Sequence, residues 1–125
     1  MINFRTDLAL ERRDLFKKAN NISKEVDGLE TQEETFDDNI KVSRVKVLNE
    51  NGEQAIGKRK GTYITIDIKN LKVAGEDQIQ KASEAVTKEL KNLIGNLVGP
   101  QEDILVVGLG NLYVTPDALG PKVVN

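Results

Sequence analysis

One carboxylate stands out along this chain because of the residues around it. Asp117 lies in the segment "VTPDALGP" (114–121), shortly after the glycine-rich turn "GLGN" (108–111). A carboxylate in such a turn can act as a general acid or a general base. An Asp in the first turn of a helix is equally common for structural reasons. Physical chemistry alone leaves both interpretations of Asp117 open.

The sequence contains no histidine and no cysteine. This excludes disulfide bonds, thiolate zinc sites and thiol nucleophiles, and it removes the usual general base. Hydrolytic chemistry in this chain must therefore use carboxylates, hydroxyls, lysines or backbone amides. We expect no cofactor and no metal site built from this chain alone, while an oxygen-ligated ion shared with residues outside the chain stays open.

Length and charge narrow the class of protein. The chain has 125 residues, 38% of them hydrophobic, which suits a single domain over 1–125 with its own core. Its 18 basic and 20 acidic residues give a net charge of −2, so no basic field attracts nucleic acid or an anionic membrane. No apolar run is long enough to cross a bilayer, and the N-terminus lacks the apolar core of a secretory signal. We expect a soluble cytoplasmic protein.

The first third of the chain combines a helix with an acidic stretch. Residues 6–20 predict a helix capped by Thr6 or Asp7, with basic residues near its end. Residues 25–39 are rich in acidic residues and lack basic ones, which predicts a solvated loop. The alternative for this acidic stretch is a docking or self-inhibitory strip.

Two strands follow. Residues 40–48 alternate between polar and apolar with one slip in phase, which predicts a bulged strand, and residues 62–68 predict its partner in a ribbon. The connection begins with a turn at 49–52. It continues with a basic loop at 57–61, which is either solvated or a phosphate contact.

A long helix and an apolar strand are predicted to position the chemistry. Apolar residues three and four apart over 75–97 predict an amphipathic helix that packs on the sheet. Residues 103–109 predict a strand buried on both faces of an α/β sheet, and such strands end where open sheets bind ligands. Gly108 and Gly110 let the backbone turn there. As a nucleotide motif "GLGN" is weak, because Tyr113 takes the place of the third glycine.

The residues also carry a family resemblance. The segment "VVGLGNLYVTPDALGPKVV" (106–124) resembles the spore germination proteases, endopeptidases of endospore-forming bacteria that degrade small acid-soluble spore proteins. The resemblance continues through "RTDLALE" (5–11), residues 40–66 and the acidic stretch between them. It implies an α/β fold, a mixed sheet with flanking helices similar to the hydrogenase maturation proteases (phosphorylase/hydrolase-like fold).

The resemblance also implies a mechanism. The family is viewed as aspartic-type peptidases, made as zymogens that trim their own N-termini, and Asp117 matches one of its two catalytic acids. An aspartic mechanism needs two carboxylates that share a proton. The second family acid lies beyond this chain, and Asp103 does not replace it, because it precedes the predicted strand. We expect Gly108, Gly110 and Asn111 to orient the substrate or to stabilise the oxyanion.

These implications define the expected protein. It is the N-terminal part of a longer peptidase, with residues 1–20 as a propeptide or N-terminal helix, or else a shortened homologue. Its expected partners are small acid-soluble spore proteins as substrate, further copies in a homotetramer or the remainder of its own chain, all in the spore core. Two other functions stay open: a non-catalytic association module, and a small ligand-binding module that uses the turn at Gly108 and Gly110.

Overall fold

The computed structural model describes residues 4–125, and the chain divides after Leu93 into two units. We call residues up to Leu93 the sheet unit and Ile94–Asn125 the C-terminal unit. Sequence analysis predicted a single domain over 1–125, which stays a prediction. Each unit is described by itself below.

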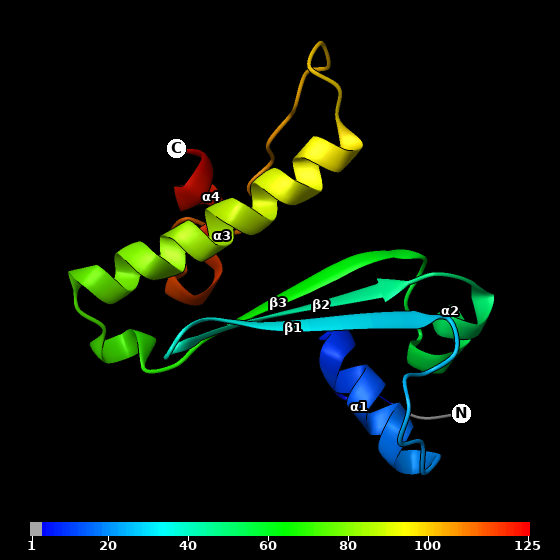
Figure 1. The fold of residues 1–125 in the computed structure, drawn as a ribbon. Helices are drawn as coiled ribbons and strands as arrows, with labels where there is room; N and C mark the ends of the chain where they lie inside the picture. Colours follow the sequence, from blue (N-terminus) through cyan, green and yellow to red (C-terminus); the bar gives the residue numbers. More distant parts are fainter. Residues whose placement is uncertain (1–3) are drawn as a thin grey trace. The chain divides into compact units, whose positions relative to one another are not determined.

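The sheet unit is built on three antiparallel strands in the order β1 (Leu29–Asp37), β2 (Ile40–Val47) and β3 (Gly61–Ile68). Figure 1 shows helices α1 and α3 on opposite faces of this sheet. The expected class, α/β with helices flanking a sheet, is therefore confirmed. Every strand pair of the described residues is antiparallel, so the mixed sheet that we expected is not observed there.

Strand β1 corrects the prediction of a loop over 25–39. Its acidic residues lie beside basic residues of β2, as in the direct pair Glu30 and Lys46 and in the ion pair between Glu33 and Lys41 at 3.4 Å. Cross-strand pairs of opposite charge stabilise an antiparallel ladder. The charge density that predicted a loop is thus neutralised by the neighbouring strand.

Strand β2 is central and is covered on both faces. Ile40 and Val42 are buried on one face, and Val45 and Val47 on the other. The register with β3 is regular along the whole strand, so the predicted bulge is absent, and the irregularity lies near the end of β1. The change in the alternation of apolar residues between Val42 and Val45 therefore marks the point along β2 where the buried apolar side chains switch from one face of the sheet to the other.

Helices α1 (Ala9–Ala19) and α2 (Glu50–Ile56) cover one face. Helix α1 confirms the helix predicted over 6–20, although Leu8 occupies its N-cap and no side chain caps it. Helix α2 replaces the turn predicted at 49–52, because the side chain of Asn49 accepts a hydrogen bond from the main-chain N–H of Gly52 at 3.2 Å. One hydrophobic cluster joins these helices to the sheet: Ala9, Val26, Leu29, Val45, Val47, Ala55 and Ile56.

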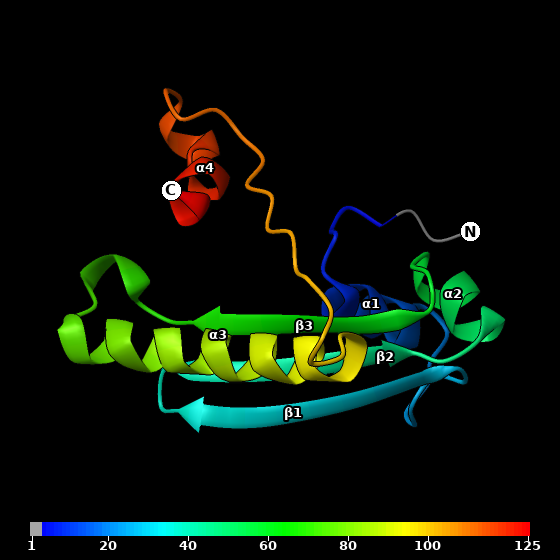
Figure 2. The ribbon, with the colours of Figure 1, turned by 90° about the horizontal axis from the view of Figure 1, so that it is seen from above.

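Helix α3 (Glu76–Leu97) covers the other face and extends along the sheet in Figure 2. It confirms the helix predicted over 75–97, but the face that it buries differs. Ala82 and Ala85 pack near Ile40, whereas Ile79 and Leu90 of the predicted apolar stripe are about half exposed. None of the described helices is long and apolar enough to cross a membrane.

Candidate functional site

The candidate site lies in the C-terminal unit, after a segment that differs from its prediction. Residues 103–109 were predicted to form a buried strand, but they form no helix or strand. Leu105 is 88% exposed and Leu109 is 82% exposed. The reason is that a strand buried on both faces needs neighbouring strands and covering helices, and the described residues provide neither for this segment. The segment has the apolar pattern of a buried strand, but the described residues supply no neighbouring strand or covering helix for it.

Beyond this segment, glycines let two stretches of backbone meet. A Cβ atom on Gly108 would lie closer than 3.0 Å to the main-chain oxygen of Gly120, and one on Gly120 would lie equally close to the main-chain oxygen of Leu109. Gly110 has φ +142°, which disfavours any other residue. The turn predicted at Gly108 and Gly110 is therefore present. Sequence analysis missed Gly120, whose only signal was its place three residues after Asp117.

Asp117 ends a short helical turn, η2 (Thr115–Asp117), which precedes helix α4 (Leu119–Val124). Val114 occupies the N-cap position of this turn, and no side chain caps it. The main-chain N–H of Asp117 donates to the oxygen of Val114 at 2.9 Å. The side chain of Asp117 is exposed, so its carboxylate is accessible to water.

Asn111 lies directly against this turn. Its main-chain N–H donates to the main-chain oxygen of Asp117 at 2.9 Å, and its side-chain oxygen accepts from the N–H of Tyr113 at 3.0 Å. Its main-chain oxygen accepts from Val114 at 3.1 Å. The structure thus brings Asn111, Gly110 and Asp117 together, and these groups of Asn111 bond within the loop itself.

The arrangement offers one accessible carboxylate held on a firmly bonded turn. Such a group can accept a proton from water, but an aspartic mechanism needs a second acid close by. Across residues 4–125 no set of three or more acidic side chains is grouped so as to hold a metal ion. The turn described here therefore presents Asp117 as a single accessible carboxylate.

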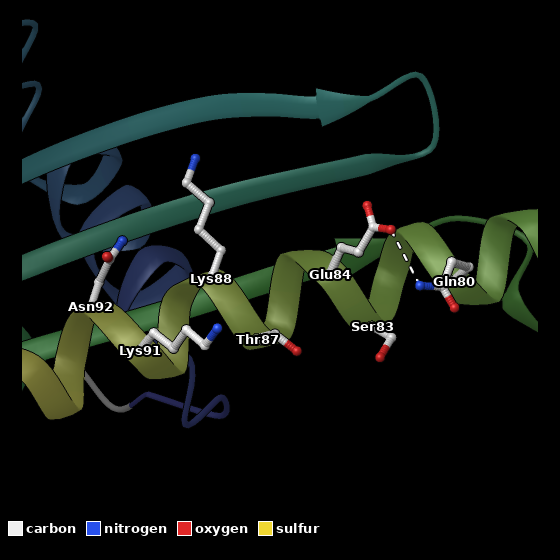
Figure 3. A pocket seen from close by; sticks show the side chains of 7 residues that line it. All are labelled: Gln80, Ser83, Glu84, Thr87, Lys88, Lys91 and Asn92. Carbon is white, nitrogen blue, oxygen red and sulfur yellow. Dashed lines mark hydrogen bonds between the residues drawn. The ribbon is translucent and has the colours of Figure 1, made fainter.

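A hollow on α3 offers no chemistry comparable to that of Asp117. It has a volume of about 410 Å³, and Figure 3 shows that all its side chains belong to this one helix, with the amide of Gln80 donating to Glu84 at 3.2 Å. The lining mixes opposite charges, including Glu84, Lys88 and Lys91. A single helix face that is open to solvent cannot surround a reacting group, so this hollow is no candidate active site.

The basic loop at 57–61 is tied to its own surroundings. The Lys58 ammonium lies 5.2 Å from the centre of the Tyr63 ring, and the Tyr63 hydroxyl donates to the main-chain oxygen of Arg59 at 2.7 Å. The main-chain N–H of Lys60 donates to the Glu53 carboxylate at 2.8 Å. These contacts connect the loop to α2 and β3, and both interpretations of its basic residues stay open.

Comparison with known proteins adds to this geometry. A family model described as germination protease matches residues 6–125. The chain belongs to the germination protease family. The match includes both the sheet unit and the turn that carries Asp117.

Individual relatives agree with the family. The germination protease of Clostridium perfringens (strain ATCC 13124) is 47% identical over 125 residues, which are 99% of this chain and 37% of the relative. That of Caldanaerobacter subterraneus subsp. tengcongensis is 46% identical over 127 residues, which cover 100% of this chain and 36% of the relative. That of Priestia megaterium is 41% identical over 126 residues, which cover 97% of this chain and 33% of the relative. The chain spans between 33 and 37% of the length of these relatives.

Proposed function

We propose that this chain is the N-terminal part of a spore germination endopeptidase and that Asp117 is one of its two catalytic acids. The observation that supports this most is the family match over residues 6–125, which includes an exposed Asp117 on a bonded turn. The proposed substrates are the small acid-soluble proteins that protect DNA in spores. The resemblance to the family described above is the basis for these substrates.

The proposed mechanism is of the aspartic type. One carboxylate takes a proton from water as the water attacks the scissile carbonyl, and the other protonates or polarises that carbonyl. Asp117 supplies one of these groups, and the second acid comes from protein beyond the present chain. The main-chain amides around Gly108 and Gly110 are proposed to face the developing oxyanion.

Replacement of Asp117 by Asn in a full-length germination protease tests the assignment. The amide has nearly the same shape but cannot accept the proton from water, so we expect turnover of a spore-protein substrate to fall by more than about a hundredfold. Asp103→Asn is the matched control, because Asp103 is also exposed but lies on the irregular segment before the turn. We expect this control to keep turnover within about threefold, well below the ~10² effect of losing an acid–base group.

Two results would contradict the proposal. The first is an Asp117→Asn enzyme that keeps at least a tenth of the wild-type turnover, a change in barrier of about 1.4 kcal/mol or less. The second is an equal loss in both variants, since that would show an effect of net charge on the unit. Circular dichroism of both variants excludes loss of fold as the cause.

The resemblance supports further proposals for the complete protein: a fold similar to the hydrogenase maturation proteases, a homotetramer, a zymogen state and a location in the spore core. The burial of Ala9 bears on which N-terminal residues are removed in the proposed zymogen. Ala9 of α1 is buried in the core, so loss of residues 1–20 would expose that cluster, whereas residues 4–8 precede the helix. We expect full-length enzyme lacking residues 1–7 to be more active, and no gain in activity would contradict this.

A second candidate function, as an association module, is favoured by the exposed apolar segment that contains Leu105 and Leu109. Cleavage assays and sedimentation of the 125-residue chain distinguish the two functions. We expect no turnover by this chain alone, because one carboxylate lacks the partner that shares its proton. The opposite result is turnover by the isolated monomer, together with loss of that turnover in the Asp117→Asn variant. This result would contradict the expectation and would mean that the second acid lies within the chain.

A further inference from the structure

The main-chain oxygen of Asp117 is enclosed by two consecutive residues. The N–H of Asn111 donates to it at 2.9 Å, and Gly110 approaches it so closely that a Cβ atom there would lie within 3.0 Å. The same Cβ atom would lie 3.1 Å from Cδ of Pro121. Asp117 itself and Pro121, four residues after it, thus lie against Gly110.

Gly120 completes a second contact between the same two stretches. A Cβ atom on Gly120 would lie 2.8 Å from the main-chain nitrogen of Leu109 and nearer still to its oxygen. The atoms that obstruct Gly120 all belong to the main chain, which cannot rotate aside as a flexible side chain can. The backbone before Gly110 and the backbone after Asp117 therefore interlock.

We propose that Gly110 and Gly120 are positioning residues for the carboxylate of Asp117, an inference that rests on the proposed function. An Asp side chain has only two rotatable bonds, so the position of its carboxylate follows closely from that of its backbone. The interlocked glycines hold that backbone. A displacement of about 1 Å at a reacting group can reduce turnover on the order of a hundredfold.

This role differs from the two that glycine-rich turns usually have. In a phosphate site, glycines let main-chain N–H groups approach a bound anion. Here the space beside Gly110 and Gly120 is filled by main-chain carbonyl oxygens, which carry partial negative charge. The space at the Cβ positions of these two glycines is therefore used for packing within the protein, whereas the proposed oxyanion contact uses the N–H groups of the turn.

The test uses Gly110→Ala and Gly120→Ala in a full-length germination protease, with kcat and KM measured separately on a spore-protein substrate. We expect kcat to fall at least thirtyfold, on the order of the loss for a displaced reacting group, with KM changed by less than about threefold. Gly95→Ala is the matched control, since nothing lies within 4 Å of its Cβ position, and we expect it to keep the wild-type kcat. A kcat within about threefold of wild type in both variants would overturn the inference.

A double-variant cycle separates positioning from a general loss of structure. In the Asp117→Asn background the carboxylate is already gone, so Gly110→Ala should reduce the residual activity no further. An equal loss in both backgrounds would contradict a positioning role. If Asp117→Asn itself keeps activity, the proposed function fails, whereas loss in Asp117→Asn with full activity in Gly110→Ala overturns only the present inference.

One measurement on the unaltered protein covers the case in which the variants fail to fold. The amide hydrogen of Asn111 is bonded to Asp117, so its exchange with solvent deuterium should be slowed at least tenfold relative to an unstructured peptide. Exchange of this amide at the unprotected rate would show that the contact is not maintained in solution and would overturn the inference.

Discussion

Arg44 at the centre of the sheet binds Glu89 of helix α3 with two of its guanidinium nitrogens. Its Nε donates to Oε2 of Glu89 at 2.9 Å and its Nη2 to Oε1, while Nη2 also contacts Glu34 of β1 at 3.0 Å. Glu89 is only 3% exposed. This network connects both β1 and α3 to the central strand. The Glu89 carboxylate is shielded from water, whereas the Glu34 side chain remains partly exposed.

Removal of the Glu89 carboxylate should be costly for stability. Glu89→Ala leaves the Arg44 guanidinium without its main partner, and breaking a buried ion pair from one side costs about 3 kcal/mol of the free energy of unfolding. Urea denaturation of the purified chain measures this change. Glu84→Ala, an exposed position on the same helix, is the control and should change stability by no more than about 0.5 kcal/mol. Equal effects of the two substitutions would show that the ion pair contributes nothing.

The same network predicts a dependence of stability on pH. The hydrogen bonds from Arg44 hold the pKa of Glu89 below its ordinary value of 4.5, and those from Arg44 and Lys88 do the same for Glu34. A carboxyl whose folded-state pKa is lowered stabilises the fold above its unfolded-state pKa, and this contribution disappears as the pH falls through the folded-state value. We expect the advantage of the wild type over Glu89→Gln to be full at pH 7 and to shrink below about pH 4.5. A difference that stays constant down to pH 3 would be incompatible with this assignment.

Two glycines of the sheet unit should not tolerate a methyl group. Gly28 has φ +81°, and a Cβ atom on it would lie within 3.0 Å of the main-chain nitrogen of Gly52 in α2. We expect Gly28→Ala and Gly52→Ala each to cost about 2 kcal/mol, because main-chain atoms, which cannot rotate aside, are among those that obstruct each Cβ position. Gly95→Ala, in an open helical position, should instead stabilise by up to ~1 kcal/mol. Thermal unfolding of the three variants measures both the expected losses and the expected gain in stability. A stabilised Gly28→Ala variant would refute the close packing of Gly28 against Gly52.

Arg12 of α1 should hold the N-terminal segment and the end of α2 together. Its guanidinium donates to the main-chain oxygens of Thr6 at 2.6 Å and of Ile56 at 3.1 Å, and it lies 5.1 Å from the centre of the Phe4 ring. Arg12→Lys keeps the charge but loses the planar fork of donors, so we expect a loss of about 1 to 2 kcal/mol. Hydrogen exchange followed by mass spectrometry should show faster exchange at both ends of the contact.

The control for Arg12 is Arg13→Lys, since the ion pairs of Arg13 within the described residues are with the carboxylates of Asp14 and Glu25. A lysine retains much of that attraction, and we expect little change in exchange. Faster exchange in the Arg13 variant alone would contradict the role assigned to Arg12.

The sequence predicted the elements whose pattern is complete within one segment. Helices α1 and α3 and strands β2 and β3 were found from their own periodicity and end residues. Strand β1 was missed because its many acidic residues are compatible with a strand only when basic residues of β2 lie beside them. This pairing depends on two segments and is not visible in either one alone. The buried face of α3 was misjudged for a similar reason, because Glu89 is buried only where Arg44 receives it.

The candidate site shows the same limit. Asp117 and the turn at Gly110 were predicted from local residue types, and the structure describes both on one bonded loop. The contact of Gly108 and Leu109 with Gly120 joins residues more than ten positions apart, and a single sequence carries no sign of it. The apolar run 104–107 was misread because its pattern describes the side chains and gives no information about the strands that must lie beside it.

Strand β2 has one more consequence, for the way in which the sheet unit folds. Val45 and Val47 belong to the hydrophobic cluster under α1 and α2, whereas Ile40 belongs to the cluster under α3. Neither cluster can form without the central strand, and the strand cannot remain ordered once either cluster has dissolved. We therefore expect the two cores to melt in a single cooperative transition, so that damage on one face of the sheet weakens the helix packed on the other.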